Sequence, residues 1–109
     1  MIHSKLVRDL VPELFGQEGP GTLHAVRQLE DDEFLSALIT KLIEEAVEVR
    51  SASSVHERVK ELADVVEVVR ALTLALTTPE HVEEVRRAKA AVLGTFANRI
   101  WMTWEDAEE

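Results

Sequence analysis

Two segments of the chain, residues 32–50 and 55–76, carry apolar residues at the spacing of an α-helix, and a short polar break at 51–54 separates them. In each segment the apolar positions recur every three or four residues, which forms a continuous stripe along one side of a helix. The stripe of the second segment covers a wider arc than one antiparallel neighbour would bury. The pattern therefore predicts two long antiparallel helices that need a further partner to complete a helical bundle.

The ends of these two helices are indicated by capping residues. We expect the first helix to begin after an N-cap at Asp31 or Asp32 and to end near Arg50, because Asp is a preferred N-cap residue. Ser53 or Ser54 can cap the second helix in the same way. We expect the second helix to end near residue 76.

A shorter third helix is predicted over residues 79–93. Thr78 is a suitable N-cap, Pro79 suits the first helical position, and Gly94 is a typical residue for ending a helix. A short helix over Pro12–Phe15, followed by a loop over residues 16–21, completes the prediction. The fold class is therefore all-α: a bundle of two long helices and a shorter third, completed by oligomerisation as a homodimer or homotetramer. We expect residues 1–109 to form a single domain.

Composition excludes several classes of function. The chain has 12 basic and 21 acidic residues, a formal net charge of −9, so nucleic acid is not an expected ligand. It has no cysteine, which excludes disulfides and thiolate metal sites. No apolar run approaches the roughly 18 residues that a membrane span needs, and the charged N-terminus does not resemble a secretory signal. We expect a cytoplasmic protein without a membrane partner.

Five acids recur in two clusters on the two long helices. The first has the pattern E-E-x-x-E, formed by Glu44, Glu45 and Glu48, and the second has E-x-x-D, formed by Glu61 and Asp64. Acids three or four residues apart share a helix face, so two antiparallel helices would gather four or five carboxylates. That much negative charge repels itself unless a hard divalent cation compensates it. Carboxylate oxygens favour Mg²⁺ first and Mn²⁺ second.

Glu61 is the most informative of the five acids. It falls inside the apolar arc of its helix, where an ionised carboxylate is costly unless it is paired or bound to a metal. A salt bridge to a lysine or arginine is the structural alternative. For the acids of the first helix, which border their apolar stripe, a solvated face is an equally good interpretation.

Other catalytic motifs are missing from the sequence. The four histidines lie outside both acidic clusters, and no Glu-x-x-His occurs, which argues against a di-iron bundle. There is neither a G-x-x-x-x-G-K-[ST] loop nor a G-x-S-x-G elbow. The chemistry that remains is metal-assisted hydrolysis of a phosphoanhydride.

The sequence resembles a known family. The pattern E-E-x-x-E followed by E-x-x-D is similar to that of the MazG-like, all-α NTP pyrophosphohydrolase superfamily, and other segments resemble its phosphoribosyl-ATP pyrophosphohydrolase-like subgroup. These segments are Lys5-Leu6-Val7-Arg8-Asp9 with Pro12, Lys41-Leu42-x-Glu44-Glu45, Glu61-Leu62-Ala63-Asp64-Val65, and Lys89 followed by Gly94-x-Phe96. Two positions depart from the subgroup: Leu10 stands where a lysine is usual, and Thr95 where a second glycine is frequent.

The resemblance implies an Mg²⁺-dependent enzyme that cleaves a nucleoside triphosphate between the α and β phosphates, giving the monophosphate and pyrophosphate. Clearance of non-canonical nucleotides is one role that we consider for such an enzyme. The resemblance also implies that Glu45, Glu48, Glu61 and Asp64 are the metal ligands and that Glu44 is an extra carboxylate that assists the attacking water or a further metal. The substrate-binding positions that it implies are Lys5, Arg8, Lys41, Lys89 and Arg99.

Two alternatives remain open at the level of sequence. One is phosphoribosyl-ATP hydrolysis in histidine biosynthesis. The other is a non-enzymatic helical oligomerisation or regulatory module, which predicts that Glu61 is exposed or salt-bridged and that no divalent ion binds. Trp101 and Trp104 could pack at a subunit interface or close over a nucleotide base.

Overall fold

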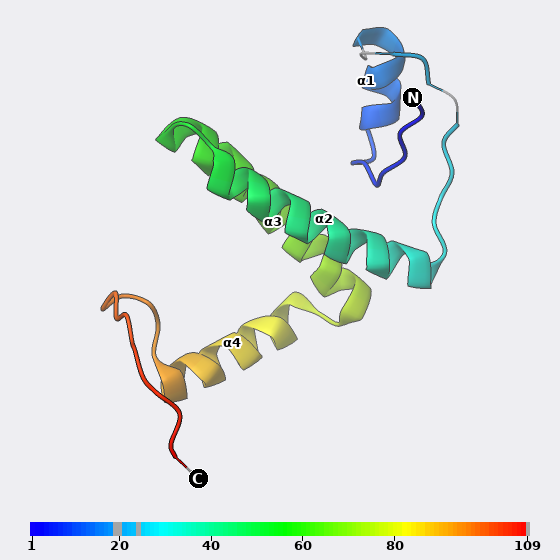
Figure 1. Ribbon diagram of the computed structural model, residues 1–109. Helices are drawn as coiled ribbons and strands as arrows, with labels where there is room; N and C mark the ends of the chain where they lie inside the picture. Colours follow the sequence, from blue (N-terminus) through cyan, green and yellow to red (C-terminus); the bar gives the residue numbers. More distant parts are fainter. Residues whose placement is uncertain (19–20, 24, 109) are drawn as a thin grey trace. The chain divides into compact units, whose positions relative to one another are not determined.

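The residues that the structure describes form four helices. A computed structural model describes residues 1–18, 21–23 and 25–108. The helices are α1 (Val11–Glu18), α2 (Asp31–Ser51), α3 (Val55–Leu76) and α4 (Pro79–Leu93), and the described ranges contain no β-strand (Figure 1). The prediction of an all-α fold with two long helices and a shorter third is confirmed.

The start of α2 differs from the prediction by one residue. Its N-cap is Glu30, not Asp31 or Asp32. The Glu33 carboxylate accepts a hydrogen bond from the backbone N–H of Glu30 at 3.3 Å, and both of its oxygens accept from the Arg27 guanidinium at 3.2 and 2.9 Å. A side chain that binds back to the N-cap satisfies one of the free donors at the helix start, and this contact selects Glu30.

The turn between α2 and α3 is closed by side chains. Ser54 Oγ accepts from the backbone N–H of Glu57 at 3.1 Å, which confirms Ser54 as a cap. The Glu57 carboxylate in turn accepts from the backbone N–H of Ser53 at 3.2 Å and from its hydroxyl at 2.7 Å. These reciprocal bonds fix the short connection that makes α2 and α3 a hairpin.

Local signals also set the ends of α4, but not the end of α1. The Thr78 hydroxyl accepts from the backbone N–H of His81 at 3.2 Å, as predicted for an N-cap. Gly94 ends α4 with φ +82°, a conformation that favours glycine, and donates to the Ala90 carbonyl at 2.8 Å. The predicted helix over Pro12–Phe15 was too short, because α1 continues through Gly16 to Glu18. Residues 19 and 20 of the predicted loop lie outside the described residues.

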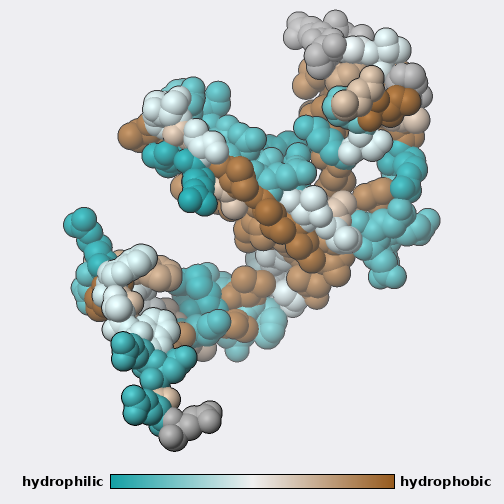
Figure 2. Space-filling model, in the orientation of Figure 1, coloured by the Kyte–Doolittle hydropathy of each residue, from teal (hydrophilic) through white to brown (hydrophobic). Residues whose placement is uncertain are grey.

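Helices α2 and α3 pack against each other along their length. Leu38 of α2 and Val68 of α3 are buried, and among the described residues they are the only side chains that are. Many other apolar residues of the hairpin stay half exposed or more. Figure 2 shows them as a brown band along the hairpin. The hairpin by itself therefore buries little of the apolar surface that its sequence supplies.

The described residues fall into two units, Met1–Leu76 and Thr77–Glu109. The first unit holds α1 and the α2–α3 hairpin. The second holds α4 and the C-terminal segment, in which Trp101 and Trp104 are exposed. A single domain over 1–109 stays a prediction. None of the described helices has the length and apolar character needed to cross a membrane.

Candidate functional site

Three of the predicted metal ligands converge at the seam between α2 and α3. Glu45 of α2 and Glu61 and Asp64 of α3 each offer a carboxylate oxygen, and these oxygens all lie within 4.8 Å of one another. The structure thus brings together residues from both acidic patterns, as the antiparallel arrangement of the two helices predicts.

The position of each acid follows from the helical repeat. Glu45 falls on the same face of α2 as the buried Leu38, seven residues earlier, and Glu61 falls on the same face of α3 as the buried Val68, seven residues later. Both helices therefore direct a carboxylate into their shared seam. The Glu45 side chain is only 14% exposed, and Glu61 and Asp64 are half-buried.

The electrostatic environment of Glu61 is unfavourable to its charge. Partial burial raises the pKa of the Glu61 carboxyl above its ordinary value of 4.5, and the negative charges of Glu48, Asp64 and Glu45 raise it further. In the part of the chain that the structure describes, no lysine, arginine or histidine forms an ion pair with Glu61. The internal salt bridge considered from the sequence is therefore not formed.

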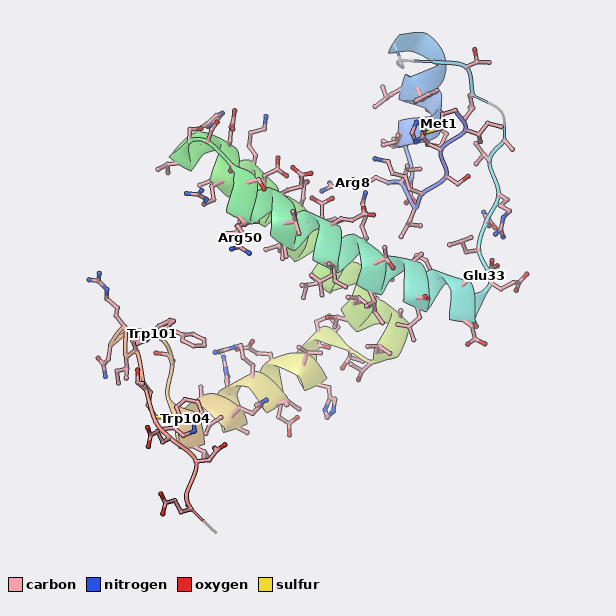
Figure 3. All side chains as sticks on the ribbon, in the orientation of Figure 1. Met1, Arg8, Glu33, Arg50, Trp101 and Trp104 are labelled. Carbon is pink, nitrogen blue, oxygen red and sulfur yellow. The ribbon has the colours of Figure 1, made fainter. Side chains whose placement is uncertain are left out.

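Two basic side chains, those of Arg8 and Lys41, border the cluster (Figure 3 labels Arg8). Arg8, on the N-terminal arm, donates from Nη2 to Asp64 Oδ1 at 2.6 Å. Lys41 Nζ lies 3.7 Å from an oxygen of Glu44 and 3.7 Å from an oxygen of Glu45. Helical spacing alone explains the Lys41 contacts, whereas Arg8 reaches Asp64 across 56 positions of sequence.

A hollow of about 250 Å³ adjoins Lys41. It lies between the N-terminal arm and α2, and its lining includes Lys5, Lys41 and Glu44. Three predicted substrate or catalytic residues therefore share one surface. Ser4 and Thr40 also line this hollow, and the sequence analysis did not select them. Thr40 lies four residues before Glu44, and residues at this spacing share a helix face. This spacing could have indicated from the sequence that Thr40 lies beside Glu44.

The other predicted site residues lie outside the group of three close carboxylates. Glu48 is exposed and outside the group of three close carboxylates, although its charge acts on Glu61. Glu44 is half exposed. Lys89 and Arg99 belong to the second unit: Lys89 lies on α4, and Arg99 closes a turn by donating its backbone N–H to the Phe96 carbonyl at 3.1 Å.

The donor set suits a hard divalent cation. All three donors are carboxylate oxygens, which are the ligands that Mg²⁺ and Mn²⁺ prefer. Oxygens on opposite sides of one Mg²⁺ lie about 4.2 Å apart, since each Mg–O distance is about 2.1 Å. Adjacent oxygens around the same ion lie about 3.0 Å apart. The three observed oxygens lie within 4.8 Å of one another, so they would have to draw closer together around a bound ion.

Comparisons with known proteins give one partial relationship. The sequence is similar to an uncharacterized protein of Mycolicibacterium smegmatis (strain ATCC 700084 / mc(2)155), with 43% identity over 51 residues. The matched region is 47% of this chain and 50% of that protein, so the chain spans about half the length of that relative. No family model matches the sequence, and no solved structure matches the chain.

Proposed function

We propose that this chain is an Mg²⁺-dependent nucleoside triphosphate pyrophosphohydrolase of the MazG-like type. It cleaves the α–β phosphoanhydride and releases a nucleoside monophosphate and pyrophosphate. Two arguments support the proposal. The order and spacing of the motifs resemble that superfamily over most of the chain, and the two acidic patterns converge on one point of the α2–α3 seam.

The observation that carries the proposal is the environment of Glu61. A half-buried carboxylate beside two others raises the free energy of the folded chain unless a cation compensates it. A solvated acidic face would place Glu61 in water, and an internal salt bridge would give it a basic partner. Neither arrangement is present among the described residues. Protonation, which the raised pKa of Glu61 favours, and a bound divalent cation are the two remaining ways to stabilise this group, and the motif resemblance favours the cation.

In this proposal Glu45, Glu61 and Asp64 would hold the cation, with Glu48 as a fourth carboxylate ligand. The cation would supply charge neutralisation at the phosphate oxygens and a lowered pKa for water. Glu44 is half exposed at the edge of the site, where its carboxylate orients the attacking water and accepts its proton.

The basic residues of the first unit bind the substrate. Lys5 and Lys41 line one hollow beside the cluster, so their ammonium groups can contact phosphate oxygens there. Arg8, which is paired with Asp64, is a third basic side chain beside the cluster that can contact phosphate oxygens. The Lys89 and Arg99 contacts that the resemblance implies stay part of the proposal.

Product analysis tests this function directly. The protein is incubated with Mg²⁺ and a panel of NTPs and dNTPs, and the products are identified by chromatography. Monophosphate and pyrophosphate are expected, and Glu45→Gln and Asp64→Asn should each abolish the reaction. Glu67→Gln is the matched control, because Glu67 is an exposed acid of α3 outside the cluster.

Two results would contradict the proposal. Orthophosphate as the initial product would exclude α–β cleavage. Hydrolysis that survives both Glu45→Gln and Asp64→Asn would show that the carboxylate cluster is not the catalytic centre.

A further inference from the structure

The hollow between the N-terminal arm and α2 is lined mostly by hydrogen-bond donors. Ser4 and Lys5 of the arm and Thr40 and Lys41 of α2 each contribute a hydroxyl or an ammonium group to it. Glu44 is the one carboxylate among the described residues that line it, and none of these residues has an aromatic ring or a side-chain amide. This lining suits a ligand that accepts many hydrogen bonds, such as an ionised phosphate.

One face of α2 forms the helical side of this hollow. Ala37, Thr40, Lys41 and Glu44 follow one another at intervals of three, one and three positions, so they lie within an arc of about 100° around the helix. Because Ala37 has only a methyl group, it leaves room for a ligand beside Thr40. The four residues therefore present two donors and one acid around a small apolar position.

The hydroxyl of Thr40 has no partner within its own helix. A threonine in a helix can donate its hydroxyl to the carbonyl of the residue four positions earlier, and Thr73 of α3 does so to Val69 at 2.8 Å. In the part of the chain that the structure describes, the exposed Thr40 makes no such bond. Its hydroxyl can therefore donate to a ligand in the hollow.

The charge of the lining favours an anion. Lys5 and Lys41 contribute two positive charges and Glu44 one negative charge, so the lining is net positive, whereas the whole chain carries −9. Lys41 Nζ lies 3.7 Å from an oxygen of Glu44 and 3.7 Å from an oxygen of Glu45, which is too far for a hydrogen bond to either. Its N–H groups therefore stay available to a phosphate oxygen.

The size of the hollow suits one part of a nucleotide. Its volume of about 250 Å³ lies below the roughly 300–1,000 Å³ of pockets that enclose a drug-sized ligand. Two linked phosphates fit such a space, but a whole nucleoside triphosphate does not. A nucleobase would also lack an aromatic surface for stacking, because none of the described lining residues provides one.

The hollow adjoins the carboxylate cluster on two sides. On the N-terminal arm, Arg8 donates to Asp64 of the cluster at 2.6 Å (Figure 3), and Lys5, three residues earlier, lines the hollow. On α2, Lys41 lies beside Glu45 of the cluster and also lines the hollow. A phosphate chain held in the hollow therefore lies next to the three close carboxylates.

We propose that this hollow binds the diphosphate end of the nucleotide and that the Thr40 hydroxyl donates to its oxygens together with the Lys5 and Lys41 ammonium groups. This inference rests on the proposed function, and it assigns the two products to different places. Pyrophosphate occupies the hollow, and the nucleoside monophosphate lies outside it. The hollow therefore distinguishes substrates by the number of their phosphates and not by their base.

The two products, used separately as ligands, test this assignment. Isothermal titration calorimetry at a fixed free Mg²⁺ concentration measures the affinity for inorganic pyrophosphate and for AMP, GMP, CMP and UMP. Thr40→Val removes the hydroxyl and keeps the shape of the side chain. We expect it to weaken pyrophosphate binding about tenfold, because a hydrogen bond to a charged group is lost, and to leave monophosphate binding unchanged.

Two further variants control for effects on the helix itself. Thr40→Ser keeps a hydroxyl and should restore pyrophosphate binding. Thr73→Val is the matched control, because it removes a threonine hydroxyl from α3, outside the hollow, and should bind pyrophosphate like the wild type. Equal losses in Thr40→Val and Thr73→Val would overturn the inference.

The remaining outcomes separate this inference from the proposed function. A wild type that does not bind pyrophosphate, or a Thr40→Val variant that loses affinity for the monophosphates in place of pyrophosphate, overturns the inference. If NTPs give monophosphate and pyrophosphate but Thr40→Val binds pyrophosphate as tightly as the wild type, the function stands and the assignment of the hollow is wrong. If pyrophosphate binding depends on Thr40 but no NTP is hydrolysed, the hollow is a diphosphate site and the proposed function is wrong.

Discussion

Arg8 Nη2 donates a hydrogen bond to Asp64 Oδ1 at 2.6 Å, which places an arginine of the N-terminal arm directly on one of the three clustered carboxylates. Both side chains are substantially exposed to solvent. An exposed ion pair is worth about 0–1 kcal/mol, so this contact is easily exchanged for another. Arg8 is therefore in a position to compete with a divalent cation for Asp64 and to move to a phosphate when substrate binds.

The first prediction concerns this competition. Arg8→Gln should tighten Mg²⁺ or Mn²⁺ binding in the absence of nucleotide, by at most about fivefold, because the cation no longer displaces an ion pair of about 1 kcal/mol. The same substitution should weaken nucleotide binding, since a positive group is lost. Isothermal titration calorimetry with Mn²⁺ alone, and then with nucleotide, measures both effects.

Arg27→Gln is the control for that experiment. Arg27 pairs with Glu33 at the start of α2, away from the cluster, so its loss should leave Mn²⁺ affinity unchanged. Weaker Mn²⁺ binding by Arg8→Gln would contradict the prediction and would show that Arg8 orients Asp64 for the cation.

The second prediction is stabilisation by divalent cations. At a cation concentration ten times its dissociation constant, binding should stabilise the folded chain by about 1.4 kcal/mol. For a domain of this size that corresponds to a rise in Tm of roughly 5–10 °C. Differential scanning fluorimetry with Mg²⁺ or Mn²⁺ measures the shift, and NaCl at equal ionic strength controls for screening. Glu45→Gln and Asp64→Asn should remove the shift, and a wild type that shows none would contradict the metal site.

The third prediction concerns pH without divalent cations. The pKa of Glu61 is raised in the folded chain, first by burial and then by neighbouring negative charges, so the folded state binds this proton more tightly than the unfolded state. The stability that Glu61 contributes is present below its ordinary pKa of 4.5 and is lost as pH rises through the raised pKa. Glu61→Gln should therefore be more stable than the wild type at neutral pH in EDTA.

Urea denaturation at several pH values tests this prediction. The stability of Glu61→Gln should fall less than that of the wild type as pH rises from 4.5. The control is Glu67→Gln, which removes an exposed acid of the same helix. Its free energy of unfolding should change with pH in the same way as that of the wild type. If Glu61→Gln and Glu67→Gln behave alike, the carboxylate of Glu61 is not destabilised by its surroundings.

The sequence predicted those features that depend on neighbouring residues. Ser54, Thr78 and Gly94 act at helix ends because caps are formed by residues within one turn. Helical spacing placed Glu45 and Glu61 on faces that meet once the two helices pack. The first prediction follows from the local chemistry of helix caps, and the second follows from the 3.6-residue repeat.

Two features were not predicted, one local and one that depends on a distant contact. Glu30 is the N-cap of α2 because Glu33, which also binds Arg27, accepts from its backbone, and no cap preference indicates that arrangement. The contact between Arg8 and Asp64 joins residues 56 positions apart. Such pairs are selected by the packing of the arm against the hairpin, which periodicity does not encode.

The last prediction concerns the connection that holds α2 and α3 together. Arg58, in the first turn of α3, donates from Nε to the Val49 carbonyl at 2.9 Å and from Nη2 to the Ala52 carbonyl at 2.8 Å. The final carbonyls of a helix have no partners within it and carry partial negative charge, so a guanidinium stabilises them well. Arg58→Ala should lower the free energy of unfolding by about 1–2 kcal/mol, measured by urea denaturation.

Two further variants separate hydrogen bonding from charge. Arg58→Lys keeps the positive charge, but a lysine ammonium cannot bind both carbonyls as the planar guanidinium does. The free energy of unfolding of Arg58→Lys should therefore lie between those of the wild type and Arg58→Ala. Arg70→Ala removes an exposed arginine from the same helix and should change stability by less than about 0.5 kcal/mol. If Arg58→Ala were no more destabilising than Arg70→Ala, these two bonds would not contribute to the hairpin. The seam would then depend on apolar packing alone to keep Glu45 next to Glu61.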